Sequence, residues 1–384
     1  MNILKDHLST LLVYDGLFIK NKNLRPMKKE KVKILGIESS CDETAVSIVE
    51  VSSSDKGKIL SNIVFSQIDQ HSPFGGVVPE IASRSHVESL SPLIDQALNE
   101  ANLKIQDIDG VAATSGPGLI GGLIVGLTTA KGIAVGLDIP LIGVNHLEGH
   151  ALTPILTNDI YPPYILLLVS GGHTQLIMVK DIGQYIQIGT TIDDAAGEAF
   201  DKAAKFLDIG YPGGPALEKI AKKGNNKKYK FPRPLQNSDD CNFSFSGLKT
   251  SLIREAKNIE PIDEKTISDL AASYQQAIID CIKIKSEMAI NKMLAQNNYS
   301  EIKYFVASGG VASNKAIRDD LTLLAQKYKM AFIAPPMKFC TDNAAMIAWV
   351  GGLRLLRGQS DELDTPARAR WSLEEMKIHE VLNG

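Results

Sequence analysis

The stretch that decides the fold is "VKILGIESSCDETAVSIVEV", residues 32–51. Its two ends, 32–38 and 44–51, are rich in Ile and Val, which favours two β-strands joined by a short polar turn. A third run of the same kind, 58–66, follows directly. The chain therefore opens with a trio of strands, and the spacing of apolar residues predicts a helix from about residue 79.

The same order of elements is predicted a second time further along the chain. A strand, a Gly-rich helix and a strand follow the first helix, at 109–115, 120–137 and 140–144. The second series has strands at 164–170, 174–180, 185–191, 303–309 and 331–334, with helices at 195–207, 264–296, 312–328 and 343–357. This order predicts an α/β protein with two related domains that face a cleft. No sequence identity at a fixed period accompanies it, so the prediction depends on the order alone.

Three Gly- or Ser-containing turns occupy matching places in this pattern: "IESSCDETA", "VSGGHTQ" and "ASGGVASN". Backbone N–H groups in such turns can approach phosphate oxygens, and glycine permits the approach. One Gly-Gly turn is weak evidence because most of them only reverse the chain. Three in matching places favour a ligand that carries phosphate. By contrast, Gly118, Gly122 and Gly126 recur every fourth residue, which favours a close-packed helix face, and no Gly-Lys-Ser/Thr follows to make a phosphate-binding loop.

Composition limits the class of protein. The chain has 384 residues, 44% of them hydrophobic, and a formal net charge of −3. It can bury a large core, and its overall charge predicts neither a membrane partner nor a nucleic-acid partner, although a local basic patch is possible. Its 4 cysteines form no CxxC pair, so we expect free thiols and a cytoplasmic location.

We expect residues 1–31 to form an extension outside the fold. The apolar run "LSTLLVYDGLFIK" is too short to span a bilayer. The basic residues follow this run, whereas in a secretory signal they precede it. An over-extended start explains the segment better than a presequence does.

A metal site is suggested by "VNHLEGHALTP", residues 144–154. On a helix, His146 and His150 are offset by only about 40° and can face one ion. An equally acceptable alternative is that both are polar groups satisfied near a domain hinge. A zinc protease is excluded, because Leu147 and Gly149 stand where HExxH or HxxEH would need Glu, and Glu148 lies about 200° around the helix from His146.

A third ligand is available in "FCTDNAAMIA", where Asp342 lies at the start of a predicted helix. The alternative role for this carboxylate is to cap that helix. Two imidazoles and one carboxylate with open positions suit Fe(II) or Zn(II).

Ten segments occur in an order that resembles the bacterial TsaD family of tRNA N6-adenosine threonylcarbamoyltransferases. They are "GIESSCDETA", "GGVVPEIASRSH", "SGPGLIGGL", "NHLEGH", "LLVSGGHTQL", "DDAAGEAFDKAAKFL", "YPGGPALE", "FSFSGLKT", "ASGGVASN" and "CTDNAAMIA". The resemblance extends from Val32 to Gly352 and leaves both ends of the chain uncovered.

The resemblance implies a fold and an activity. The fold is the actin/Hsp70/sugar-kinase (ASKHA) superfold, in which duplicated ribonuclease-H-like domains surround a central cleft. The implied division is an extension at 1–31, an N-terminal lobe at 32–145, a C-terminal lobe with inserted helices at 146–357 and a tail at 358–384. The implied reaction moves threonylcarbamoyl from L-threonylcarbamoyl-adenylate to N6 of the adenosine just 3′ of the anticodon, in tRNAs that read codons beginning with adenine. AMP is released, and TsaB and TsaE are the implied partner proteins.

The resemblance also assigns residues. His146, His150 and Asp342 would bind one divalent metal ion per subunit, with Fe(II) favoured and Zn(II) possible. The adenylate would meet Leu168, Val169, Ser170, Gly171, Gly172, Asp201, Gly214, Glu218 and Asn314. Within this set, Asp201 and Glu218 would face ribose hydroxyls and the Gly-Gly turns would face phosphate. Archaeal relatives have a metal-binding Tyr at the position of Leu168, so a phenolate ligand is excluded here.

Two further features could serve the reaction. Asp42 or Glu43 could accept the proton of the attacking amine, although solvated turn residues are an equally good interpretation. The segment "KIAKKGNNKKYKFPRPL", residues 219–235, could bind tRNA phosphates with its basic side chains, with Tyr229 and Phe231 interleaved, or could be a solvated loop. Its basic residues are Lys219, Lys222, Lys223, Lys227, Lys228, Lys230 and Arg233. The competing functions are a small-molecule kinase of the same superfold and a non-catalytic actin-like scaffold.

Overall fold

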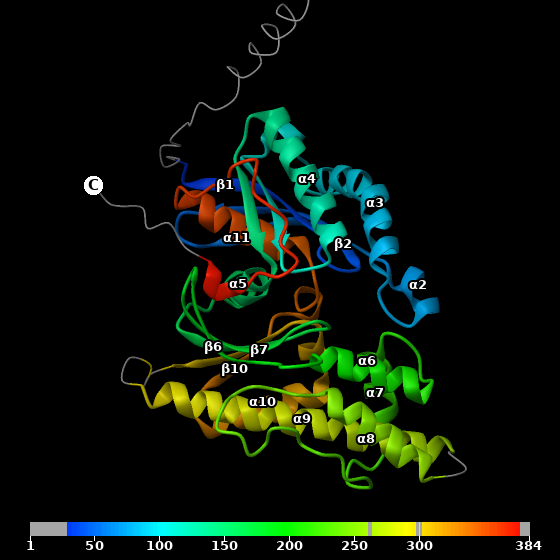
Figure 1. The fold of residues 1–384 in the computed structure, drawn as a ribbon. Helices are drawn as coiled ribbons and strands as arrows, with labels where there is room; N and C mark the ends of the chain where they lie inside the picture. The colour runs from blue at the N-terminus through cyan, green and yellow to red at the C-terminus, as the bar shows by residue number, and fades with distance from the viewer. Residues whose placement is uncertain (1–28, 260–262, 297–298, 300–301, 377–384) are drawn as a thin grey trace, which may run out of the picture.

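The computed structural model describes residues 29–259, 263–296, 299 and 302–376 (Figure 1). The predicted extension at 1–31 lies outside the described residues except for its last three. Lys31 is the first residue of the first strand.

Two five-stranded sheets with the same topology form the framework. The first sheet has the order β3-β2-β1-β4-β5 and the second has the equivalent order β8-β7-β6-β9-β10. In both sheets the first three strands pair antiparallel, and the fourth strand runs parallel to the first. The strands are β1 Lys31–Glu38, β2 Glu43–Ser52, β3 Gly57–Ser66, β4 Gly110–Gly116, β5 Leu141–Asn145, β6 Tyr164–Val169, β7 Thr174–Asp181, β8 Gln184–Thr190, β9 Tyr304–Ser308 and β10 Ala331–Ile333. The duplicated α/β architecture predicted from the order of elements is confirmed.

The helices fill three layers around these sheets. They are α2 Ile68–His71, α3 Pro79–Glu100, α4 Ile120–Leu137, α5 His146–Asn158, α6 Ala196–Leu207, α7 Gly213–Ala221, α8 Ser246–Lys257, α9 Glu264–Leu294, α10 Lys315–Lys327 and α11 Ala344–Leu356. Short 3₁₀ helices are η1 Ser72–Phe74, η2 Ile105–Asp107, η4 Gly310–Ser313, η5 Met337–Phe339 and η6 Leu373–Glu375. Helices α2, α7 and α8 were not predicted.

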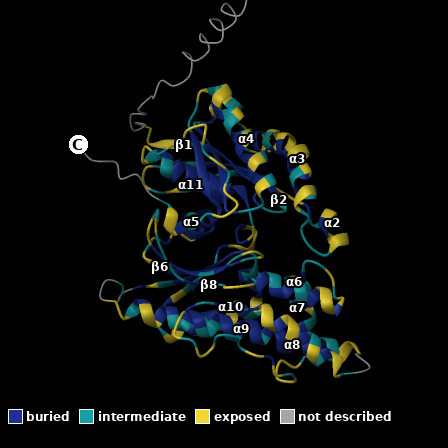
Figure 2. Cartoon of the chain, viewed as in Figure 1, coloured by how far each residue is buried: buried dark blue, intermediate teal, exposed yellow. Residues whose placement is uncertain are grey.

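The middle layer, between the two sheets, is formed by α5 and α11 (Figures 1 and 2). One hydrophobic cluster combines residues of both helices with inward-facing residues of both sheets, among them Ile34, Leu166 and Trp349. The two outer layers have separate cores, under α3 and α4 on one side and under α6 to α10 on the other. The ends of α5 and α11 are therefore fixed by packing on both sides.

Helix α11 packs against the first sheet, although we expected residues up to 357 to belong to the C-terminal lobe. It contacts β1, β2 and β4 closely because glycines face the strands. A Cβ atom at Gly351 would lie 2.5 Å from the Cβ of Ala112, and one at Gly352 would lie 2.4 Å from Cγ2 of Val51.

The chain after α11 also returns to the first sheet, whereas we expected a tail from 358. Asp361 N donates to Leu141 O at 2.8 Å, and Arg368 N donates to Ser115 O at 2.7 Å. Residues 358–376 are therefore attached to the N-terminal lobe along much of their length.

Among the described helices, α4 has the length and composition of a segment that could cross a membrane. One face of this helix is buried inside the protein, however, because Leu127, Ala130 and Ala134 belong to the core that it shares with α3. Gly122 and Gly126 lie against Ser39, where a Cβ atom would be 2.2 Å and 2.1 Å from its O and Oγ atoms. The predicted close-packed glycine face is confirmed for Gly122 and Gly126, whereas Gly118 precedes the helix and lies against Ser40. Together these contacts hold the turn after β1 in place.

Candidate metal and nucleotide site

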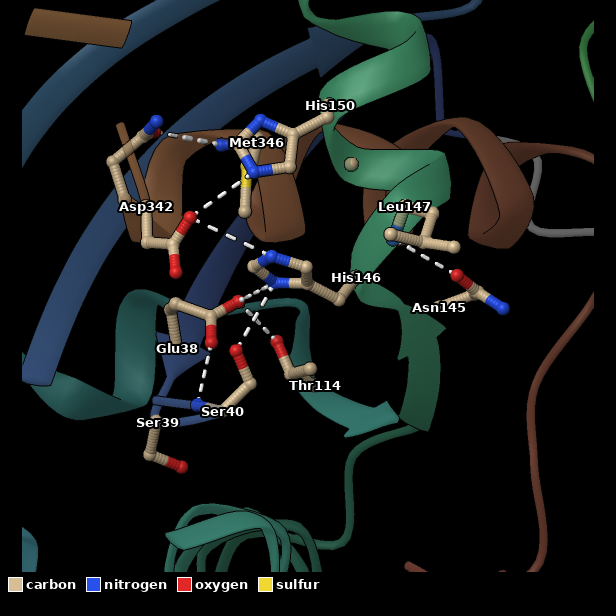
Figure 3. Close-up of polar contacts among 12 residues, drawn as sticks. Glu38, Ser39, Ser40, Thr114, Asn145, His146, Leu147, His150, Asp342 and Met346 are labelled. Carbon is tan, nitrogen blue, oxygen red and sulfur yellow. Dashed lines mark hydrogen bonds and ion pairs between the residues drawn. The ribbon is translucent and has the colours of Figure 1, made fainter. Parts of the chain in front are cut away.

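Two imidazoles and one carboxylate converge where α5 and α11 begin (Figure 3). His146 is the first residue of α5, and His150 follows one turn later. His146 Nε2 lies 3.5 Å from Asp342 Oδ1, and His150 Nε2 lies 3.1 Å from the same oxygen. The three potential ligand atoms lie within 4.8 Å of one another. These residues can therefore reach a common ion.

The helix starts leave these side chains free to act as ligands. The side chain of Asn145 caps α5 by accepting a hydrogen bond from Leu147 N at 2.9 Å. Helix α11 is capped by Asn343, which accepts from Met346 N at 3.2 Å. The alternative role for Asp342, capping α11, is therefore excluded.

The donor set fits a borderline divalent cation such as Fe(II) or Zn(II), because it combines two imidazole nitrogens with one carboxylate oxygen. His146 and His150 are buried, whereas the Asp342 side chain is 19% exposed, so the ligand set is reached from the Asp342 side. Glu148 takes no part. Its Oε1 accepts from Tyr185 Oη at 3.0 Å on the opposite face of α5, in agreement with the exclusion of a zinc protease.

The ionisable groups of the site strongly affect one another's pKa values. Burial alone would lower the pKa of His146, but the negative charges of Asp342 and Glu38 outweigh burial and raise this pKa to about 9. Burial likewise opposes ionisation of Asp342, yet the neighbouring imidazoles hold the pKa of its carboxyl well below the usual range. Without an ion, a proton on His146 balances these acids, and a cation bound there must displace it.

Two residues near the ligands were missed by sequence reasoning. Glu38 ends β1, is fully buried and accepts from His146 Nδ1 at 3.0 Å. His173, in the turn between β6 and β7, has its ring centroid 6.5 Å from that of His146. Burial and the charges of the nearby histidines lower the pKa of His173 to about 4, so it is neutral. Neither residue has a local signal, because each is brought to the ligands only by the tertiary fold.

The acidic turn after β1 lies in the same electrostatic environment. Burial, followed by the charges of Asp342 and Asp42, raises the pKa of Glu43 well above its usual value. The turn is held by Gln67 N, which donates to Asp42 O at 3.1 Å, and by His86 Nε2, which lies 3.0 Å from Cys41 O. Of the two carboxylates that we expected to face the amine, Glu43 thus lies close enough to Asp342 for their charges to interact.

The residues expected to bind the adenylate fall into two groups. The first is the end of β6, where the side chains of Leu168 and Val169 are buried in the hydrophobic clusters and only backbone atoms can face a ligand. Beyond them, Gly171 and Gly172 are exposed, and a Cβ atom on either would meet nothing within 4 Å. Ser170 O also lies against the first turn of α6, since a Cβ atom at Gly197 would be 2.5 Å from it.

The second group lies beside a pocket of about 410 Å³ between α7, α9 and α10. Glu218 lines this pocket, and its Oε1 accepts from Lys315 N at 3.2 Å. Asn314 caps α10 and donates to Gln275 Oε1, in the pocket wall, at 3.0 Å. Asp201 accepts from Gly213 N at 2.8 Å at the start of α7, beside Gly214. The structure therefore brings Glu218 and Asn314 together, and it places Asp201 at the neighbouring helix terminus.

The basic segment 219–235 begins in the last turn of α7 and continues beyond it. Its six lysines are exposed, whereas Arg233 Nε donates to Asp280 Oδ2 at 2.9 Å. Phe231 is only 5% exposed, and its ring centroid lies 5.7 Å from that of Tyr274. Tyr229 packs against the same core. Phe231 therefore anchors the segment in the core and is not available to contact a nucleic acid.

Comparisons with solved structures support the fold. HypF from T. kodakarensis matches with a TM-score of 0.58 and 14% identity, over 87% of this chain and 50% of that chain. Full-length HypF in a phosphate- and nucleotide-bound form matches with a TM-score of 0.53 and 13% identity, over 86% and 56%. At such low identity the likeness shows the fold alone, and it agrees with the expected ASKHA superfold.

Sequence comparisons are more specific. The family model TsaD, described as tRNA N6-adenosine threonylcarbamoyltransferase, matches residues 58–349. The protein of that name from Bartonella tribocorum is 52% identical over 352 residues, which cover 90% of this chain and 97% of that protein. The one from Brucella suis is 52% identical over 344 residues, covering 90% and 96%. With the fold and a three-ligand site in place, these matches establish that the chain belongs to the TsaD family of tRNA N6-adenosine threonylcarbamoyltransferases.

Proposed function

We propose that this protein transfers threonylcarbamoyl from threonylcarbamoyl-adenylate to N6 of the adenosine just 3′ of the anticodon in tRNA, with release of AMP. The observation that carries the proposal is the convergence of His146, His150 and Asp342 within 4.8 Å in a chain of this family. The family also favours this transfer over a small-molecule kinase, for which a His₂Asp site has no evident role.

We further propose that the three residues bind Fe(II) or Zn(II). Such an ion would act as a Lewis acid and stabilise negative charge on substrate oxygens. The chain itself contributes the burial of both imidazoles, which keeps them out of bulk water, and the partly exposed Asp342, which borders the path to the substrate.

The adenylate would extend from the metal ligands toward the pocket beside α7. The backbone of Ser170, Gly171 and Gly172 would meet the phosphate, because open glycines let N–H groups approach its oxygens. Glu218, in the pocket wall, and Asp201, at the start of α7, would accept hydrogen bonds from ribose hydroxyls. The polar wall formed with Asn314 and Gln275 would surround the base.

Asp42 or Glu43 would accept the proton that N6 loses when the new carbon–nitrogen bond forms. The raised pKa of Glu43 supports this role, since a carboxylate with a raised pKa is a stronger base. Single-turnover transfer measured for Asp42→Asn and Glu43→Gln tests both candidates. Unchanged rates in both variants would remove these acids from the reaction.

The exposed lysines of segment 219–235 would bind tRNA phosphates. Replacing four of them with Gln should weaken tRNA binding and flatten its salt dependence, while adenylate binding stays the same. Substitution of four exposed lysines elsewhere provides the control, and equal tRNA affinity in both variants would mean that the segment is only a solvated surface. The substituted lysines are Lys222, Lys223, Lys227 and Lys228, and the control lysines are Lys58, Lys104, Lys180 and Lys303.

The remaining proposals concern the location of the protein, its partner proteins and the boundaries of its lobes. We propose a cytoplasmic location, TsaB and TsaE as partner proteins, and lobes at 32–145 and 146–357, with α11 and residues 358–376 packed against the first of these lobes. Co-purification of the tagged chain from its own cells tests the partners, since absence of both would remove them.

The activity itself is tested by nucleoside mass spectrometry of tRNA after depletion of the protein. Threonylcarbamoyladenosine should disappear, return with the wild-type chain and stay absent with His146→Ala. Persistence of the modified nucleoside after depletion would instead favour a kinase or a non-catalytic scaffold.

A further inference from the structure

We propose that Glu38 is a positioning residue that fixes the His146 ring with a proton on Nδ1, leaving Nε2 for the metal. This inference rests on the proposed metal site, which it deepens by assigning a role to a residue outside the ligand set.

The hydrogen bonds around Glu38 determine which nitrogen of His146 carries the proton. Ser40 N donates to Oε1 at 2.7 Å, and Thr114 Oγ1 donates to Oε2 at 2.6 Å (Figure 3). The third neighbour is His146 Nδ1, 3.0 Å from Oε2. An ionised carboxylate can only accept, so the nitrogen that faces it must carry a hydrogen. The other nitrogen, Nε2, lies 3.5 Å from Asp342 Oδ1, and its lone pair becomes available to a metal ion when the proton on this nitrogen is displaced.

The packing of β1 keeps Glu38 in place. Its backbone pairs with Ala45 of β2, and the preceding residue pairs with Ala113 of β4. The turn that follows is held on α4, where Ser39 Oγ donates to Gly122 O at 2.9 Å, and Leu119 N donates to Ser40 O at 2.7 Å. Because Glu38 is fully buried and attached on both sides, it can set the orientation of the ring.

The second imidazole has no such support. His150 Nδ1 is buried and has no hydrogen-bond partner among the described residues. Orientation of the ligand pair toward a metal therefore depends on the two groups that contact His146 Nδ1. Glu38 Oε2, at 3.0 Å, is the closer, and Ser40 Oγ lies at 3.2 Å. A hydrogen-bonding group behind a metal-binding histidine commonly raises metal affinity 10- to 100-fold.

A second buried carboxylate provides the matched control. Glu148 lies on α5 between the two histidines, is 1% exposed and bonds to Tyr185 without touching a ligand. Glu38→Gln cannot satisfy its three donors, because one amide face carries hydrogens of its own. Glu148→Gln changes the same chemical group in the same region and leaves His146 unaffected.

The test measures Zn²⁺ affinity of the purified full chain by competition with a chelator. We expect Glu38→Gln to bind Zn²⁺ about 10- to 100-fold more weakly than the wild type. Glu148→Gln should stay within about threefold of the wild type, and Glu38→Asp should fall between the two Gln variants. Equal affinity of Glu38→Gln and the wild type would overturn this inference while leaving the metal site intact.

A second measurement needs no variant of Glu38. Histidine-selective ¹⁵N NMR of the zinc-loaded wild type should show a proton on Nδ1 of His146, identified by loss of its signal in His146→Ala. A metal-bound Nδ1 would overturn the inference. Equally weak zinc binding by the wild type and His146→Ala would overturn the metal site and the inference together.

Discussion

Replacing Gly122 with Ala tests how tightly α4 holds the turn that follows β1. The new Cβ atom would lie 2.2 Å from Ser39 O and 3.0 Å from Nε2 of His86. The first of these atoms belongs to the backbone, so it cannot move aside unless the turn moves. At Gly126 the nearest atom is Ser39 Oγ, at 2.1 Å, which can rotate away at the loss of its hydrogen bond to Gly122 O.

The expected free energies follow from these contacts. Overpacking costs about 1–3 kcal/mol, whereas Ala in place of Gly within a helix gains about 0.5–1 kcal/mol. Gly122→Ala should therefore lower the free energy of unfolding by about 1–2 kcal/mol. Gly126→Ala should be close to neutral, because one lost hydrogen bond of about 1 kcal/mol offsets the gain. A Cβ atom at Gly132 or Gly136 meets nothing within 4 Å, so Ala there should stabilise by about 0.5–1 kcal/mol.

Urea unfolding of the four variants measures these differences as shifts in the transition midpoint at constant slope. The order of stability should be Gly132→Ala and Gly136→Ala first, then Gly126→Ala, then Gly122→Ala. Zn²⁺ affinity should fall in Gly122→Ala, since the displaced turn carries the N–H group that bonds to Glu38. If Gly122→Ala proves as stable as Gly132→Ala, the close contact between α4 and the turn does not exist in solution.

Three further predictions concern charge and buried hydrogen bonds. In metal-stripped protein, Glu43→Gln should raise the midpoint of urea unfolding at pH 7 and leave it unchanged near pH 4. The pKa of Glu43 in the folded protein lies above the usual 4.5, so ionisation of this carboxyl lowers the free energy of unfolding as the pH rises from there. An equal gain at both pH values would contradict this sign. Zn²⁺ at 100 times its dissociation constant should stabilise the wild type by about 2.7 kcal/mol and leave the midpoint of His146→Ala unchanged; a shift in both would place zinc elsewhere. Tyr185→Phe removes the donor to the buried Glu148 Oε1 and should lower the free energy of unfolding by about 1–3 kcal/mol. An unchanged urea midpoint would mean that water replaces the hydroxyl.

Regular elements with strong periodicity could be predicted closely from the sequence. The Gly-rich helix predicted at 120–137 matches α4, and the first strand trio matches β1 to β3 within a residue at each end. Helix α7 was missed because it begins with Gly213-Gly214-Pro215, which has the composition of a turn. Its first N–H group is instead satisfied by Asp201, which lies 12 residues earlier in the preceding helix.

The metal ligands could be predicted because two of them share a helix and the third lies at the start of another predicted helix, and the family resemblance then assigned all three. The role of Glu38 could not be predicted, because nothing in the neighbouring sequence distinguishes one acidic residue at the end of a strand from another. Its partner His146 lies 108 residues further along the chain. The periodicity of apolar residues also could not predict which sheet α11 packs against, because α11 is apolar on all sides.

The position of α11 has a consequence for how the protein is made. A ribosome releases the first five strands long before residues 344–356, yet these residues cover the inner face of the first sheet. Until they emerge, Ile34, Val49 and Val51 have no permanent cover on that side. The half of the molecule that is synthesised first therefore completes its fold among the last, and a nascent chain stopped after β5 should be sensitive to proteases that the finished protein resists.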